Sequence, residues 1–187
     1  MSNKKQSQLR IIAGRLRGRK VTFPNVSAIR PTTDRIRETV FNWLNPYLEN
    51  ARCLDAFAGS GILGFEALSR LAKEVSFIDH SKINIQSIIN NTKKLDMDAH
   101  IKTYREDFFK LATHILPFDV IFLDPPYHQK FINNALTALI ERKWINSETV
   151  IYIEGEKNIS QELPKRCQII KEKATRAIYI ALIKMRC

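Results

Sequence analysis

The residues best suited to chemistry lie at 124–127, where the sequence reads Asp-Pro-Pro-Tyr directly after an apolar stretch. Two consecutive prolines fix two φ angles and remove two N–H donors, so the turn holds its neighbours rigidly. The carboxylate of Asp124 and the carbonyl of Pro125 are then two acceptors for the hydrogens of an amino group. Tyr127 adds a flat ring on which a nucleic-acid base can stack, a contact worth roughly 1–3 kcal/mol. The turn therefore predicts a site for an aromatic amine.

Such a turn could promote alkylation of the amine through geometry. An aryl amine is a poor nucleophile because its lone pair is delocalised into the ring. Two acceptors placed for a tetrahedral nitrogen would favour localising that lone pair. A base inside a helix reaches such a pocket only when it is flipped or already looped out. The alternative is a proline turn that merely ends a strand, with Tyr127 as a packing residue.

A second candidate site is the segment at 54–64, which contains Gly59, Gly61 and Gly64 in the spacing GxGxxG between an expected strand and an expected helix. Glycines at this place permit a tight turn, the approach of a ligand to the backbone, and close packing of the helix on the strand. Asp79 ends the next expected strand, where a carboxylate can hold two ribose hydroxyls. The pattern predicts a nucleoside cofactor, with close packing alone as the alternative.

The acid that precedes these glycines bears on which nucleoside cofactor is bound. The carboxylate of Asp55 would repel a pyrophosphate. S-adenosylmethionine has no phosphate and carries a positive sulfonium and a positive ammonium group, so an acid nearby is favourable. The sequence therefore favours S-adenosylmethionine.

The elements that must position these residues alternate between strand and helix. Strands are expected near 52–56, 75–79, 100–104, 118–124 and 149–154, helices within 30–48, 62–71, 81–95 and 131–142, and a final hairpin at 167–183. This order predicts an α/β fold with a mostly parallel sheet, helices on both faces and an antiparallel C-terminal hairpin. Ligands of such sheets bind beyond the carboxyl ends of the strands. Residues 55–64, Asp79, Asp107 and 124–127 all lie at or just beyond the carboxyl ends of expected strands, so we expect them to converge.

The net charge of +11 is concentrated at the two ends of the chain. Residues 1–37 carry +9 and residues 164–187 carry +6, whereas residues 38–163 carry −4. Basic ends on a slightly acidic body are typical of a nucleic-acid binder. We expect a single domain over 1–187, with a flexible tail at 1–8, a basic β-hairpin at 9–30 and a catalytic core at 31–187. The hairpin would present these basic residues to phosphates: Arg10, Arg15, Arg17, Arg19 and Lys20.

Several classes of protein are not indicated. No apolar run approaches the roughly 18 residues that span a bilayer, and the N-terminus lacks the apolar region of a signal peptide. The three cysteines are far apart, so neither a metal site nor a disulfide framework is expected. These features predict a protein of the reducing cytoplasm without membrane partners.

The motifs resemble those of a known family. The segments at 54–61 and 124–127 are similar to those of Rossmann-like, S-adenosylmethionine-dependent class I amino-methyltransferases. More narrowly, residues 10–21, 30–44 and 54–70 resemble the bacterial enzymes that methylate N2 of a guanine in 16S ribosomal RNA, and the resemblance covers nearly the whole chain. It implies methyl transfer from S-adenosylmethionine to guanine 966 in 16S ribosomal RNA of the small ribosomal subunit or its assembly intermediate. A monomer is the simplest expectation for the oligomeric state.

The resemblance also implies roles for individual residues. The target base would be held by Asp124, Pro125 and Tyr127. The cofactor would be held by a larger set: Asp55, Gly59 and Gly61 at its methionine end, Asp79 at the ribose, Asp107 at the adenine amino group, and Thr32 and Arg35 closing over the methionine moiety.

Other functions stay open from the residues alone. The turn at 124–127 recognises an exocyclic amine and not guanine itself, so adenine-N6 methylation of DNA or RNA is an alternative, although no DNA target-recognition domain is evident. Methylation of a protein glutamine amide is a further option, but such enzymes typically show Asn at the first position of the turn. A basic RNA-binding module without chemistry would not need the glycine segment or Asp124.

Overall fold

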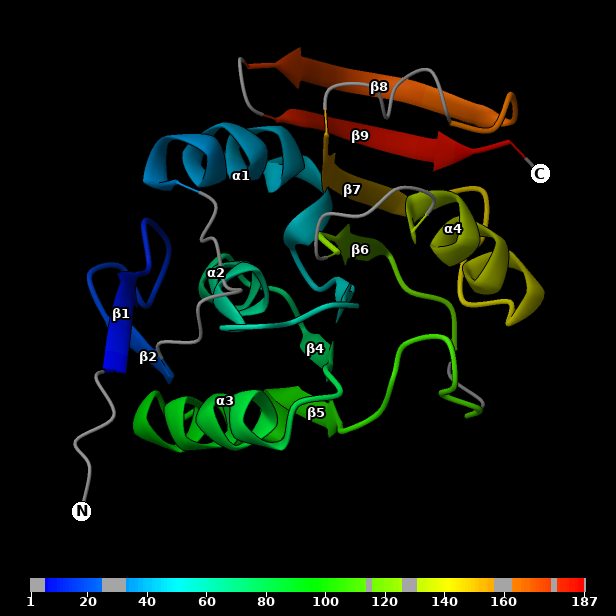
Figure 1. Ribbon diagram of the computed structural model, residues 1–187. Coiled ribbons are helices and arrows are strands. Elements are labelled where there is room, and N and C mark those ends of the chain that lie inside the picture. Colours follow the sequence, from blue (N-terminus) through cyan, green and yellow to red (C-terminus); the bar gives the residue numbers. More distant parts are fainter. Residues whose placement is uncertain are drawn as a thin grey trace.

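The computed structural model describes residues 6–24, 33–113, 116–125, 131–156, 163–175 and 178–186 (Figure 1). The strands are β1 Gln6–Arg10, β2 Lys20–Pro24, β3 Arg52–Asp55, β4 Glu74–Ile78, β5 Ile101–Tyr104, β6 Val120–Leu123, β7 Val150–Gly155, β8 Cys167–Ala174 and β9 Tyr179–Met185. The helices are α1 Asp34–Leu48, α2 Ile62–Ser69, α3 Lys82–Lys94 and α4 Phe131–Glu141, with a short 3₁₀ turn at Asp98–His100. Within this part of the chain, no helix combines the length and apolar character needed to cross a membrane.

The main sheet has seven strands in the order β5-β4-β3-β6-β7-β9-β8. The strands from β5 to β7 pair in parallel, whereas β9 runs antiparallel to both β7 and β8. The chain moves from β3 outward to β5 and then returns to β6 on the other side of β3. The mostly parallel sheet with an antiparallel C-terminal hairpin is thus confirmed, and its switch point lies between β3 and β6.

Helices cover both faces of the sheet, as predicted. In Figure 1, α1, α2 and α3 lie on one side of the strands and α4 lies on the other. Successive side chains of β6 alternate between two apolar clusters: Phe122 packs with residues of α1, α2 and α3, whereas Ile121 and Leu123 pack with residues of α4. Because both faces are covered, β6 is buried along its whole length and reads as a continuous apolar run.

The basic hairpin forms a separate two-stranded antiparallel sheet whose strand β2 packs against α3, and the loop that joins its strands contacts α2. The side-chain amide of Asn91 on α3 accepts from the Thr22 N–H at 2.9 Å and donates to the Thr22 carbonyl at 2.6 Å. Ile11 and Val21 are fully buried in the core cluster of α1–α3. The hairpin is therefore part of the folded core.

The expected boundary of this hairpin was wrong at its start. Residues 6–8, expected in a flexible tail, belong to β1 and pair with residues 22–24 of β2. Strand pairing is held by backbone N–H and C=O groups, which polar residues supply as readily as apolar ones. The polar residues 6–8 therefore gave no sign of pairing in the sequence.

Substitution of Phe122 tests this packing. Phe122 lies on the central strand β6 and is fully buried, and its ring centroid is 5.7 Å from that of Phe41 on α1. We expect Phe122→Ala to lower the free energy of unfolding by about 3–5 kcal/mol, since the substitution leaves a cavity between sheet and helix. The measurement is urea denaturation. Ile169→Ala, at an exposed position of β8, is the control and should change that free energy by only about 0.5 kcal/mol.

Candidate active site

Four neighbouring parallel strands are each followed or ended by an aspartate. Asp55 ends β3, Asp79 follows β4, Asp107 lies beyond β5, and Asp124 follows β6. Because these strands are consecutive in the sheet, their carboxyl ends meet at one edge. All four residues line a single cleft of about 330 Å³. The predicted convergence is confirmed for these four aspartates, whereas residues 126 and 127 lie outside the described residues.

The three glycines of the GxGxxG segment have different surroundings: Gly59 and Gly61 lie in the loop between β3 and α2, and Gly64 lies in α2. A Cβ on Gly59, whose φ is +51°, would meet only a backbone oxygen at 3.9 Å and would otherwise enter open space. A Cβ on Gly64 would lie 2.2 Å from the ring of Phe77. Gly61, with φ of +75°, precedes α2 and also packs against Phe77. Close packing therefore explains Gly64 and much of Gly61, whereas Gly59 leaves room for a ligand at the backbone.

Asp79 ties this loop to the edge of the sheet. Its Oδ2 accepts from the Gly59 N–H at 2.8 Å and from Nδ2 of Asn84 at 3.1 Å, and its Oδ1 accepts from the Ser81 N–H at 2.7 Å. A carboxylate offers about four acceptor positions, so one is left for a ligand. Asn84 also lines the cleft, and its Oδ1 is buried and makes no hydrogen bond to the described residues. Asp79 and Asn84 thus each have one acceptor position without a donor among the described residues.

Asp55 lies at the base of the cleft and is buried. Burial raises the pKa of its carboxyl group to about 8, and the charge of Asp79 adds to the rise, whereas the Gly64 N–H, which donates to Oδ2 at 3.1 Å, opposes it. The group therefore holds its proton near neutrality. A cation placed in the cleft would favour the ionised form, so this acid is suited to a positively charged ligand.

An aromatic wall completes the cleft and was missed by the sequence reasoning. It consists of Phe57, Phe108, Phe109 and Phe131, with ring centroids 5.1 Å apart for Phe57 and Phe108 and 5.7 Å apart for Phe109 and Phe131. The two consecutive phenylalanines directly after Asp107 are the feature of the sequence that could have indicated this wall. Phe131 begins α4 and is placed here only by the fold. Such a wall suits a flat, largely apolar ligand group.

Some predicted site residues are not placed in the cleft. Arg35 is exposed in the first turn of α1, and Gly61 does not contribute to the cleft surface. Pro125, by contrast, is buried next to Asp124 and lines the cleft. Thr32 and Tyr127 lie outside the described residues. The roles of all these residues stay predictions.

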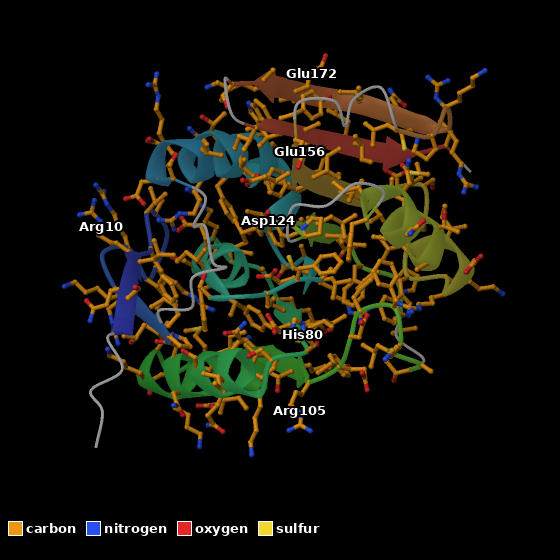
Figure 2. All side chains as sticks on the ribbon, in the orientation of Figure 1. Arg10, His80, Arg105, Asp124, Glu156 and Glu172 are labelled. Carbon is orange, nitrogen blue, oxygen red and sulfur yellow. The ribbon has the colours of Figure 1, made fainter. Side chains whose placement is uncertain are left out.

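The predicted RNA-binding residues form a basic surface on the hairpin. Arg10, Arg15, Arg17, Arg19 and Lys20 are all exposed. Figure 2 shows Arg10 at the outer side of the molecule, on the hairpin, and Asp124 nearer its middle. Two of the arginines contact the C-terminal end of α3 and the residues that follow it. Nη2 of Arg19 donates to the Lys94 carbonyl at 2.8 Å, and Nη2 of Arg15 lies 3.3 Å from Sδ of Met97. Their guanidinium groups are therefore partly fixed in place.

The sheet order, the glycine loop after β3 and the acids at successive strand ends define a Rossmann-like class I methyltransferase. A solved structure of a candidate methyltransferase from Escherichia coli, yhhF, superposes with a TM-score of 0.86 at 36% sequence identity, covering 96% of this chain and 98% of that one. The chain belongs to the family described as Conserved hypothetical protein 95, whose model matches residues 9–184.

Two curated relatives share the same name, ribosomal RNA small subunit methyltransferase D. The one from Buchnera aphidicola subsp. Acyrthosiphon pisum is 42% identical over 177 residues, covering 94% of this chain and 92% of the relative. The one from Haemophilus influenzae is 42% identical over 174 residues, covering 91% and 90%.

The raised pKa of Asp55 predicts a pH-dependent stability. The unfolded chain releases this proton near its ordinary pKa of 3.8, whereas the folded protein keeps it up to about pH 8. The free energy of unfolding should therefore fall as pH rises between these values, by up to about 1.4 kcal/mol per pH unit. Urea denaturation at pH 5, 6, 7 and 8 measures this for the wild type and for Asp55→Asn, which lacks the titration. A stability difference between the two that is constant with pH would contradict the assignment.

Proposed function

We propose that this protein transfers the methyl group of S-adenosylmethionine to the exocyclic N2 of a guanine in 16S ribosomal RNA of the small ribosomal subunit. The observation that carries the proposal is that the Asp124–Pro125 turn and the glycine loop at Gly59 open into the same cleft. An acceptor for an amine and a cofactor-binding loop thus share one space. The names of the curated relatives support ribosomal RNA of the small subunit as the substrate class.

The residues of the cleft fit this cofactor. S-adenosylmethionine supplies an electrophilic methyl group on a positively charged sulfonium. Asp55 would bind the positive methionine end in its ionised form, and the open space at Gly59 would admit that end close to the backbone. The spare acceptor of Asp79 and the unpartnered Oδ1 of Asn84 suit the two hydroxyls of a ribose.

The adenine end of the cofactor would lie against the aromatic wall, where Phe57 and Phe109 offer flat apolar surface. Asp107 stands at the edge of this wall. One of its oxygens accepts from the Phe109 N–H at 2.8 Å, and the other could accept from the adenine amino group. In this proposal Gly61, Thr32 and Arg35 complete the methionine end.

The target base would enter from the side of the cleft formed by β6. The carboxylate of Asp124 and the carbonyl of Pro125 would accept the two hydrogens of the guanine amino group. That arrangement directs the nitrogen lone pair toward the cofactor side of the cleft, which is catalysis by positioning. Tyr127 would stack on the base, which must be flipped or looped out to reach it.

The distribution of charge supports an RNA substrate. The cleft is lined by carboxylates, which repel phosphates, whereas the hairpin residues Arg10, Arg15, Arg17, Arg19 and Lys20 attract them. The backbone of the RNA would therefore lie on the hairpin while one base enters the cleft. We propose that the protein acts as a monomer, and small ribosomal subunits as substrate would place it in the cytoplasm.

The direct test is transfer of a labelled methyl group from S-adenosylmethionine to small subunits isolated from cells that lack this protein, followed by analysis of the nucleosides. N2-methylguanosine is expected. N6-methyladenosine would replace the proposal with the adenine alternative. Binding of the cofactor without any transfer to RNA would overturn it.

Asp124 should matter for the chemical step and little for cofactor binding. Asp124→Ala removes an acceptor for the amine, so we expect kcat to fall by about 10²–10³-fold while the Kd for S-adenosylmethionine changes little. Steady-state kinetics and calorimetry measure the two quantities. Asp98→Ala, at an exposed acid outside the cleft, is the control and should leave both unchanged. Lost cofactor binding in Asp124→Ala would show that this residue belongs to the cofactor site.

The hairpin should set the salt dependence of RNA binding. Replacing Arg15, Arg17 and Arg19 by Ala should flatten the slope of log K against log salt by about 0.7 for each lost contact with single-stranded RNA. Filter binding at several salt concentrations measures the slope. Removing the exposed lysines Lys171 and Lys173 of β8 is the control for loss of charge alone. An equal slope in wild type and the triple variant would remove the hairpin from the RNA site.

A further inference from the structure

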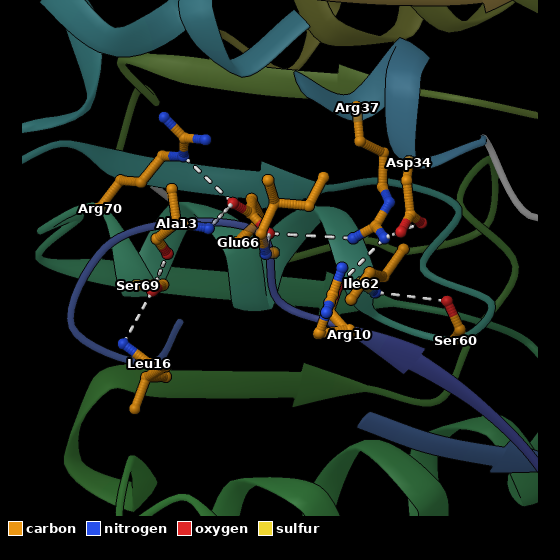
Figure 3. Close-up of polar contacts among 12 residues, drawn as sticks. Arg10, Ala13, Leu16, Asp34, Arg37, Ser60, Ile62, Glu66, Ser69 and Arg70 are labelled. Atoms are coloured by element: carbon orange, nitrogen blue, oxygen red, sulfur yellow. Dashed lines mark hydrogen bonds and ion pairs between the residues drawn. The ribbon is translucent and has the colours of Figure 1, made fainter. Parts of the chain in front are cut away.

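The loop at residues 11–19, which joins β1 and β2, is held on α2 by one buried carboxylate. Oε2 of Glu66 accepts from the Ile12 N–H at 2.8 Å, and its Oε1 accepts from the Ala13 N–H at 3.0 Å (Figure 3). Glu66 has no exposed surface. Each oxygen of this side chain therefore binds the backbone of the hairpin loop.

Two arginines surround the same carboxylate. Nε of Arg70 lies 3.2 Å from Oε1 of Glu66, and Nη1 of Arg37 lies 3.8 Å from its Oε2. The fully buried Arg37 also donates from Nη2 to the Arg10 carbonyl at 3.0 Å and to Oδ1 of Asp34 at 2.7 Å. A buried charge is tolerated when it is paired and hydrogen-bonded. Glu66 thus joins α1, α2 and the hairpin through hydrogen bonds and ion pairs, although Nε and Nη1 of the buried Arg37 have no hydrogen-bond partner among the described residues.

Ser69, one turn further along α2, adds a second anchor. Its hydroxyl accepts from the Leu16 N–H at 2.9 Å and donates to the Ala13 carbonyl, and its own carbonyl accepts from the Arg15 N–H at 2.8 Å. A Cβ on Gly14 would lie 2.0 Å from that carbonyl oxygen. The loop lies so close to α2 that only glycine fits at this position.

The helix that holds the hairpin also forms a wall of the cleft. Ile62 and Leu63, in the first turn of α2, line the cleft, and the Gly64 N–H binds Asp55. Glu66 and Ser69 follow three to six residues after Leu63, which at 1.5 Å per residue is roughly 5–9 Å along the axis. One rigid helix therefore carries the cofactor-side wall at one end and the basic hairpin at the other.

We propose that Glu66 and Ser69 are positioning residues for the RNA substrate, a proposal that rests on the proposed function. They hold the exposed arginines of the hairpin at a fixed distance from the cleft, so that RNA bound by its phosphates presents its base at Asp124. A mobile basic tail would supply attraction alone, since long-range charge needs no fixed geometry. A fixed second contact supplies orientation, which a reaction controlled by positioning requires.

The test compares two glycines of the same loop. Gly14 and Gly18 have φ values of +80° and +83°, so alanine brings similar backbone strain at both. Only the methyl group of Gly14→Ala meets Ser69, because a Cβ on Gly18 has no atom within 4 Å. Both variants keep every arginine. We expect Gly14→Ala to lower kcat/KM for small subunits by at least about tenfold relative to Gly18→Ala, with an unchanged Kd for S-adenosylmethionine.

A second variant covers the case in which Gly14→Ala does not fold. Ser69→Ala removes the hydroxyl contacts to Ala13 and Leu16 without adding an atom, and it should show the same split between kcat/KM and cofactor affinity. Equal kcat/KM values for the folded variants and Gly18→Ala would overturn the inference and leave the proposed function standing. Loss of cofactor affinity together with kcat/KM would also overturn it, since the contact would then only support the fold. No methyl transfer by the wild type would instead overturn the proposed function.

Discussion

The site depends on the parallel pairing of β3 with β4 and β6. Asp55 is in register with Phe77 of β4 and with Phe122 of β6, and Asp79 and Asp124 follow two residues after those partners. Since neighbouring strands lie about 4.8 Å apart, the three aspartates fall within roughly 10 Å of one another. Like charges so close are costly unless donors or protons compensate. Asp79 has three hydrogen-bond donors, and Asp55 keeps its proton, so the same pairing that creates the cleft also sets its electrostatics.

The acidic cleft and the basic hairpin together would orient an RNA chain in a way that neither could alone. Carboxylates would exclude phosphates from the cleft, and the exposed arginines would bind them outside it. This division of charge controls orientation only if the distance between the two surfaces is fixed. The contacts of Glu66 and Ser69 with residues 12–16 provide that rigidity in the folded protein.

Most of the fold follows from patterns that are local in the sequence. Apolar runs such as 120–123 predicted the strands, and helical spacing such as that of Val40 and Leu44 predicted the helices. The aspartates at the strand ends predicted the cleft. What the sequence could not distinguish depends on tertiary neighbours: Gly64 is required by the ring of Phe77, whereas Gly59 faces open space. Glu66 could not be recognised either. Its main partners are backbone N–H groups 53 and 54 residues away, which leave no trace in residue type.

The two buried acids near α2 show how structural and ligand-responsive groups differ. Glu66 is compensated inside the protein, by two backbone N–H groups and two guanidinium groups. Asp55 has one backbone N–H donor and, among the described residues, no basic side chain in an ion pair, so a proton compensates it instead. A proton can be displaced by a cation that enters the cleft. The partners of Glu66, in contrast, cannot leave unless the hairpin loop separates from α2. The acid that lacks a permanent cation is therefore the one suited to a positively charged ligand, and the acid with fixed partners is suited to holding the hairpin.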